Sequence, residues 1–159
     1  INSEATSRRL PKEKAISIIA ATRKEIINEI ILVGSNKEAA FVKEVYNALP
    51  DKTNITNQAG KTNLTELILL FNSSTTMLTT DSGPAHVANA LGTHTVVLFG
   101  AGNENNTAPY NKNNSTIIRL GQLNCEPCVS NSCKLYGVPQ CLVRLDEQLI
   151  VSAVKNVLH

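Results

Sequence analysis

The residues best suited to chemistry lie in one short segment, Thr80-Asp81-Ser82-Gly83-Pro84-Ala85-His86. A strand is expected before this segment and a helix after it, and Pro84 suits the first turn of that helix. Gly83 has no side chain, so an anion can approach the exposed N–H groups and the positive end of the helix dipole. The spacing predicts an anion site, while a turn capped by Asp81 or Ser82 with no ligand explains the same residues.

Four cysteines make a second chemically capable group, with the spacing C-x2-C-x4-C-x7-C over Cys125, Cys128, Cys133 and Cys141. Four thiolates in one loop can hold a structural zinc ion or an iron–sulfur cluster. Reduced buried thiols and two disulfides are the alternatives. A metal at this loop (residues 125–141) would fix the loop and would take no part in catalysis.

The elements that must position these groups alternate between strand and helix. Apolar or β-branched runs predict strands at 30–33, around residue 55, and at 76–80, 95–99 and 117–118. Helical spacing of apolar residues predicts helices at 11–23, 36–49, 63–71, 84–91 and 146–158. The asparagine-rich stretch 102–115 is expected to be a loop. The fold class is therefore α/β, a Rossmann-like parallel sheet with helices on both faces.

Composition limits the class of protein further. The chain has 159 residues and a mass of 17.2 kDa, the size of one domain, so residues 1–159 are taken as a single unit. No apolar run approaches the length of a membrane-spanning helix. A net charge of +2 and an aromatic content of 4% do not favour nucleic-acid binding. The chain opens at Ile1-Asn2, typical of the last residues of a strand, and is expected to be excised from a longer protein.

Three segments carry a resemblance to a known family. They are Asn57-Gln58-Ala59-Gly60-Lys61-Thr62-Asn63-Leu64-Thr65-Glu66-Leu67, then Asp81-Ser82-Gly83-Pro84-Ala85-His86, then Ala90-Leu91-Gly92-Thr93. Together with Leu98-Phe99-Gly100 and Cys125-Glu126-Pro127-Cys128, they resemble glycosyltransferase family 9, the heptosyltransferase family. The order and spacing agree over nearly the whole chain. The chain is similar to the C-terminal, donor-binding half of the two-domain GT-B fold of that family.

The resemblance implies a nucleotide-diphosphate sugar donor, typically ADP-heptose, and transfer to the lipopolysaccharide core by an inverting mechanism without a metal. It also implies that no catalytic residue lies in this domain, because the general base belongs to the N-terminal acceptor domain, which is absent here. The fragment is then expected to bind donor and to be inactive alone. Its expected location is the cytoplasm, at the periphery of the inner membrane.

Donor-binding roles follow from the resemblance position by position. Ser82 and Gly83 match residues that hold the donor diphosphate. His86 matches a histidine near the donor, and a partly buried helix-face histidine is an equal alternative. Asp81 would repel phosphate and is expected to take sugar hydroxyls or to order the turn. Arg8 matches a phosphate-binding lysine, and its guanidinium can keep that role.

Two further donor contacts are implied nearer the start of the chain. Glu38 resembles the family glutamate that accepts hydrogen bonds from the ribose hydroxyls. An exposed glutamate in a first helical turn is the alternative. Thr62 falls where the family places backbone contacts to the base. The segment Arg8-Arg9-Leu10-Pro11 has Leu10 where the family has tryptophan, and Arg9 also fits a solvated basic residue before a helix.

Two other functions fit parts of the same pattern. A GT-B sugar-nucleotide epimerase would share the fold and the diphosphate site, but the motif set matches family 9 more closely. A non-enzymatic module stabilised by metal at the four cysteines would bind metal and no nucleotide.

Overall fold

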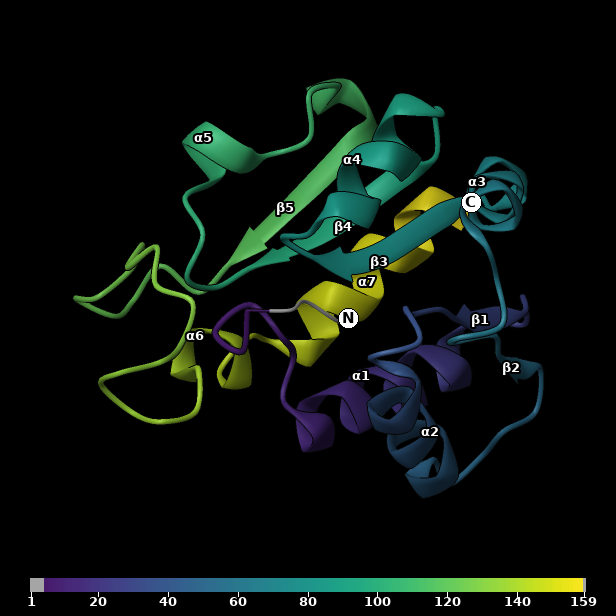
Figure 1. The fold of residues 1–159 in the computed structure, drawn as a ribbon, viewed down its shortest axis with the longest axis horizontal. Helices are drawn as coiled ribbons and strands as arrows, with labels where there is room; N and C mark the ends of the chain where they lie inside the picture. Colours follow the sequence, from purple (N-terminus) through teal and green to yellow (C-terminus); the bar gives the residue numbers. More distant parts are fainter. Residues whose placement is uncertain (1–4, 159) are drawn as a thin grey trace.

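The computed structural model describes residues 5–158, so the strand ending predicted at Ile1-Asn2 lies outside the described residues. The strands are β1 (Ile30–Leu32), β2 (Ile55–Asn57), β3 (Thr76–Thr80), β4 (His94–Phe99) and β5 (Ser115–Arg119). The main helices are α1 (Lys12–Glu25), α2 (Ala39–Ala48), α3 (Leu64–Ser73), α4 (Gly83–Ala90) and α7 (Glu147–Leu158). Strands and helices alternate as predicted, in the α/β class (Figure 1).

The strands form two hydrogen-bonded groups, where the sequence predicts one parallel sheet. β1 pairs in parallel with β2, and β3, β4 and β5 form a separate parallel group in that order. In Figure 1 the β1–β2 pair lies apart from β3. The prediction of parallel pairing is confirmed, while the two halves of the expected sheet are not joined by hydrogen bonds within the described residues.

β4 is the central strand of the larger group and is buried on both faces. Val96 and Leu98 belong to the main core together with residues of α1 and α7, while Val97 and Phe99 pack against Ala85 of α4. Alternate residues of a strand point to opposite faces, so a strand covered on both sides reads as a continuous apolar run. This burial explains the apolar and β-branched run that predicts a strand at residues 95–99.

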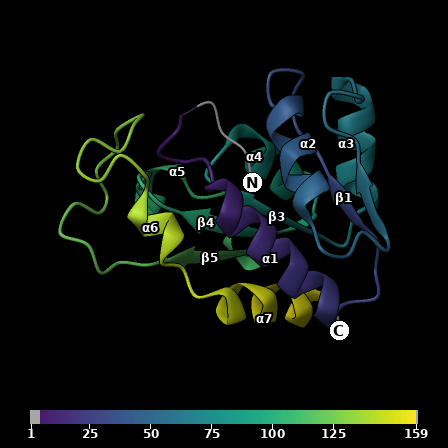
Figure 2. The same ribbon diagram turned by 90° about the horizontal axis from the view of Figure 1, so that it is seen from below.

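The first and last helices of the described chain lie side by side on the face of the sheet opposite α4 (Figure 2). Lys14 Nζ lies 2.9 Å from Glu147 Oε1, and Ser17 Oγ donates to Glu147 Oε2 at 2.5 Å. Lys14 also donates to the carbonyl of Leu145 at 2.7 Å. These polar contacts fix α1 against the start of α7, above an apolar layer that both helices share.

Three short helices were not predicted. Helix α5 (Glu104–Thr107) and a single 3₁₀ turn (Lys112–Asn114) lie inside the stretch 102–115, which was expected to be a loop. The Asn103 side chain accepts a hydrogen bond from the Asn105 N–H, so an asparagine that favours loops begins a helical turn here. Helix α6 (Gln140–Val143) is one turn long, too short for an apolar periodicity.

The helices of residues 5–158 are short. α1, with 14 residues, is too short to span a bilayer, and none of the other helices in this range has the length and apolarity to do so.

The contact between α1 and α7 predicts a pH-dependent stability. Burial of the Glu147 carboxyl opposes its ionisation, but hydrogen bonds from Ser17 and Lys14 outweigh this and lower its pKa from 4.5. Because the pKa is lower in the folded state, the stabilisation is present above pH 4.5 and is lost as the pH falls through the folded value. Glu147→Gln should cost about 1 kcal/mol at pH 7. Urea unfolding should show this difference at pH 7 and little at pH 3, and an equal difference at both would contradict the assignment.

Candidate functional site

The carboxylate of Asp81 joins three segments at the carboxyl end of β3. Arg8 Nη1, from the segment before α1, lies 3.6 Å from Asp81 Oδ2. Thr107 Oγ1, at the end of α5, donates to the same oxygen at 3.3 Å. The Asp81 side chain is 5% exposed, so its charge is held by these neighbours and not by bulk water. Of the two roles expected for Asp81, this geometry supports the one that orders the turn.

The backbone of Gly102 lies directly against this carboxylate. A Cβ atom placed on Gly102 would fall on the Asp81 carboxylate itself. The close approach allows the chain after β4 to cover the end of β3, and only glycine permits it without movement. Gly102 was not predicted from the sequence to belong to the site. The available signal was a glycine three residues after the end of a strand.

Arg8 keeps donors that Asp81 does not use. Its Nε is buried and has no hydrogen-bond partner among the described residues. Its side chain is 26% exposed, so part of the guanidinium faces solvent beside the Asp81-Ser82 turn. A guanidinium has five donors in a rigid fork, and one ion pair at 3.6 Å leaves most of them for an anion.

The alternative explanation of this turn, a cap on α4 by the side chain of Asp81 or Ser82, is not borne out. Ser82 is the N-cap residue by position, but its hydroxyl makes no capping bond. Ser82 Oγ instead donates to the Thr80 carbonyl at 3.0 Å and lies 3.2 Å from Thr79 Oγ1. The backbone at Ser82 is extended, and the neighbouring end of β3 is buried. The Ser82 hydroxyl therefore points back towards β3. The first turn of α4 is consequently open to a ligand.

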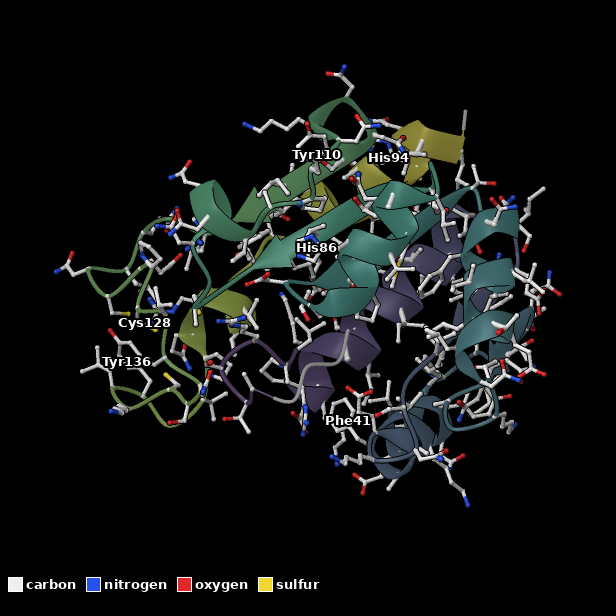
Figure 3. All side chains as sticks on the ribbon, turned by 45° about the horizontal axis from the view of Figure 1, so that its top comes forward. Phe41, His86, His94, Tyr110, Cys128 and Tyr136 are labelled. Atoms are coloured by element: carbon white, nitrogen blue, oxygen red, sulfur yellow. The ribbon has the colours of Figure 1, made fainter. Side chains whose placement is uncertain are left out.

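Gly83 and His86 lie on the solvent side of this first turn. Gly83 is exposed, and a Cβ there would meet no atom within 4 Å. His86 is also exposed and projects from α4 in Figure 3, so it is not the partly buried helix-face histidine of the alternative interpretation. The two residues leave free space at the positive end of the α4 dipole.

Glu38 and Thr62 belong to a second pair of loops, at the carboxyl ends of β1 and β2. The Glu38 carboxylate accepts hydrogen bonds from the N–H and the hydroxyl of Ser35, both at 2.8 Å. The Gly60 N–H donates to the Gly34 carbonyl at 2.9 Å, which holds the two loops together. Thr62 is half-buried two residues later, immediately before the Asn63 cap of α3.

The structure therefore gathers the predicted residues into two groups. Arg8, Asp81, Ser82 and Gly83 lie together at the end of β3, whereas Glu38 and Thr62 lie at the ends of β1 and β2. Carboxyl ends of parallel strands are where ligands bind in open α/β sheets, and both groups satisfy that rule.

Arg119 was not predicted from the sequence to have a role. It ends β5, its side chain is only 13% exposed, and its Nη2 lies 2.6 Å from Glu104 Oε2. Its Nη1 donates to the Gly100 carbonyl at 2.9 Å and to Glu126 at 3.3 Å, and its Nη2 donates to the Gly102 carbonyl. The available signal for Arg119 was a charged residue directly after two isoleucines at the end of a strand. Arg119 fixes the loop that covers Asp81.

The four cysteines surround one small cavity of about 20 Å³, together with Glu126 and Tyr136. All four are free thiols, and Cys128 lies beside Tyr136 on the loop in Figure 3. Within residues 5–158, no three histidine, cysteine or acidic side chains are arranged as ligands of a metal ion. The structural metal predicted from their spacing stays a prediction.

The model of glycosyltransferase family 9 (heptosyltransferase) matches residues 8–138 of this chain. Lipooligosaccharide heptosyltransferase 2 of Haemophilus influenzae is 37% identical over 93 residues, 57% of this chain and 27% of the relative. Lipopolysaccharide heptosyltransferase 2 of Salmonella typhimurium is 33% identical over 106 residues, 64% of this chain and 30% of the relative.

Two solved structures share the fold. The Escherichia coli ADP-heptose lps heptosyltransferase II superposes with a TM-score of 0.78 at 24% identity, over 97% of this chain and 43% of that one. A glycosyl transferase family 9 protein of Veillonella parvula gives a TM-score of 0.77 at 21% identity, over 99% and 44%. The chain spans less than half the length of each of these proteins.

The close approach of Gly102 to Asp81 predicts that Gly102→Ala destabilises the protein. The added methyl must displace the carboxylate from Arg8 and Thr107, an overpacking that costs about 1–3 kcal/mol. We expect Tm to fall by roughly 2–10 °C in a thermal unfolding experiment. Gly83→Ala is the matched control, because its Cβ meets open space and Tm should not fall. Equal Tm values for both variants would contradict the packing at Gly102.

The environment of the cysteines predicts unequal reactivity. Burial, together with the nearby negative charge of Glu126, raises the pKa of Cys141 from 9.0 to about 11, while Cys128 is exposed. Only the thiolate is alkylated, so ionisation alone should slow Cys141 about 100-fold relative to an unperturbed thiol. Iodoacetamide labelling with EDTA, followed by peptide mass spectrometry between pH 7 and 9, should show Cys128 modified first. Modification of Cys141 at the same rate as Cys128 would contradict this environment.

Proposed function

Because the chain belongs to glycosyltransferase family 9, the heptosyltransferase family, we propose that it is the donor-binding part of an enzyme that transfers a sugar from a nucleoside diphosphate. The shared fold and the match over residues 8–138 support this assignment. The matched relatives are more than twice as long, so the acceptor side of the reaction belongs to further polypeptide in this proposal.

The proposed reaction is an inverting displacement at the anomeric carbon of the sugar. An acceptor hydroxyl oxygen forms a bond to that carbon while the bond from the carbon to the diphosphate oxygen breaks. The electron pair of the broken bond leaves with the nucleoside diphosphate, and the acceptor proton passes to a base outside this domain. Negative charge grows on the diphosphate during the step, so a preorganised positive environment there lowers the barrier.

The observation that carries the proposal is the open first turn of α4 beside a guanidinium with unused donors. The Ser82 hydroxyl does not cap the turn, Gly83 leaves space beside it, and Arg8 lies within 3.6 Å of the adjoining Asp81. A helix N-terminus and an arginine fork are the groups that proteins use for phosphates. In this role Asp81 positions Arg8 and does not touch the diphosphate, and no metal is needed to neutralise the charge.

We assign the rest of the donor to the second group of residues. Glu38 would exchange its bonds to Ser35 for the ribose hydroxyls, and the backbone at Thr62 would contact the base. The names of the relatives favour ADP-heptose as donor and a lipopolysaccharide core as acceptor. An enzyme with that acceptor would work in the cytoplasm at the inner membrane.

Titration calorimetry of the full-length protein with ADP, UDP and GDP, without added metal, tests the proposal. Saturable binding of ADP, tighter than that of UDP or GDP, is the expected result. Tighter binding of UDP or GDP would support the assigned site but would mean that the donor carries a nucleotide other than ADP. Absence of binding to all three would overturn the proposed function.

Two substitutions test the residues. Gly83→Ala should leave Tm unchanged or slightly higher, yet lower ADP affinity about tenfold, because the methyl fills the space left for the diphosphate. Arg8→Ala should lower affinity by about 10- to 100-fold through the loss of charged hydrogen bonds. The exposed Arg144→Ala controls for net charge and should bind as the wild type does. Unchanged affinity in both test variants would contradict the assigned diphosphate site.

A further inference from the structure

The loop between β5 and α6, residues 120–139, is long and has little packing of its own. It contains no helix or strand, and none of residues 120–138 is buried. Four of its apolar side chains are exposed: those of Val129, Leu135, Tyr136 and Val138. In Figure 1 the loop extends outward beside α6. A loop of this length that cannot bury apolar surface needs a cross-link or a metal ion to hold one conformation.

Four thiols meet at one cavity beside this loop. Cys125, Cys128 and Cys133 come from the loop, and Cys141 lies in the single turn of α6. All four line a cavity of about 20 Å³. A cavity of that volume holds one water-sized particle, so it has room for a single metal ion but not for a cluster of several iron and sulfide ions. Within residues 5–158 the sulfur atoms are not arranged as ligands, so binding requires the cysteine side chains to turn towards the cavity that they line.

The wall of the same cavity carries a buried charge with a free oxygen. The Glu126 side chain lines the cavity and is 4% exposed. Its Oε2 accepts hydrogen bonds from Arg119 at 3.3 Å and from the Gly121 N–H at 3.0 Å. Its Oε1 is buried and has no hydrogen-bond partner among the described residues. A buried carboxylate oxygen without a donor indicates a nearby cation or water.

This carboxylate distinguishes between the two ways of cross-linking four thiols. Two disulfides would join the loop to α6 but would add no positive charge beside Glu126. A divalent cation would hold the same four sulfur atoms and would also supply the positive charge that Glu126 Oε1 lacks. Zinc binds four thiolates in structural sites, and the C-x2-C spacing of Cys125 and Cys128 is typical of such sites. A zinc site therefore accounts for the thiols and for the carboxylate together.

We propose that the four thiols bind one structural Zn²⁺ ion as thiolates, with the Glu126 carboxylate beside it. Each thiol loses its proton to solvent on binding, and the ion takes the place of the four protons. Zinc has no redox chemistry, and here it would take no part in sugar transfer. The assignment does not depend on the proposed function, because it uses only the thiols, the cavity and the carboxylate.

The loop that the ion would fix holds two parts of the candidate site. The Ser7 N–H donates to the Asn131 carbonyl at 3.2 Å, and the Val129 N–H donates to the Ala101 carbonyl at 2.8 Å. Ser7 directly precedes the arginine that contacts Asp81, and Ala101 directly precedes the glycine that packs against the same carboxylate. Zinc would thus stabilise the geometry around Asp81 without touching it.

Metal analysis of the full-length protein tests the proposal. The protein is purified under reducing conditions without a chelator, incubated with zinc sulfate and desalted before elemental analysis. We expect about one zinc ion per chain in this segment, and X-ray absorption spectra should show four sulfur ligands at about 2.3 Å. Less than about a tenth of a zinc ion per chain, a ligand shell with fewer sulfur atoms, or iron as the bound metal would overturn the proposal.

Variants of the loop locate the ion. Cys128→Ser removes an exposed thiol, and we expect the zinc affinity, measured by competition with a chelating dye, to fall at least about tenfold. Ser132→Ala changes an exposed serine of the same loop and is the matched control, with the zinc affinity of the wild type. Glu126→Gln removes the negative charge and should lower the zinc affinity about tenfold. Unchanged zinc affinity in Cys128→Ser would overturn the proposal.

Thermal unfolding tests the structural role of the ion. A strong chelator should lower the Tm of the wild type and of Ser132→Ala, because both lose a bound ion that stabilises the folded state. The same chelator should change the Tm of Cys128→Ser less, since this variant binds zinc weakly. A wild-type Tm that is the same with and without chelator would contradict the role of zinc in holding the loop.

Discussion

The arrangement of the candidate site depends on one buried charge, the carboxylate of Asp81. It is 5% exposed and is reached by Arg8 from before α1, by Thr107 from α5 and by the bare backbone of Gly102. Removing one partner of a buried ion pair typically costs about 3–5 kcal/mol, because the remaining charge has no water to compensate. The three segments are thus held in one relative position, with Arg8 and Asp81 beside the open first turn of α4.

A second charged group supports the first from the opposite side of the covering loop. Arg119 binds the Gly100 and Gly102 carbonyls and both Glu104 and Glu126. Its Nε and Glu126 Oε1 have no partner among the described residues, so this network is not fully satisfied. Buried networks of this kind fix one geometry at a cost in stability, and here the fixed element is the loop that carries Gly102 against Asp81.

The sequence was a good guide where one local signal decided the outcome. β3 and β4 were found from their apolar runs, and the Asp81-Ser82-Gly83 turn from its glycine and proline. Outcomes that depend on distant segments were not predictable: the Ser82 hydroxyl turns to Thr80, and Arg119 reaches two glutamates across a loop. The division of the sheet was also missed, since pairing between strands is set by neighbours in space and not by the composition of each strand.

The side-by-side packing of α1 and α7 has a consequence for how the protein is made. Lys14 and Glu147 are 133 residues apart, and Lys155 pairs with Glu25 across 130 residues. At roughly 5–20 residues per second, a ribosome completes the partner helix on the order of ten seconds after the first one. For that interval, the part of the apolar face of α1 that packs against α7 has no α7 to cover it. The packing between α1 and α7 is therefore completed only after nearly all of the described chain has been made.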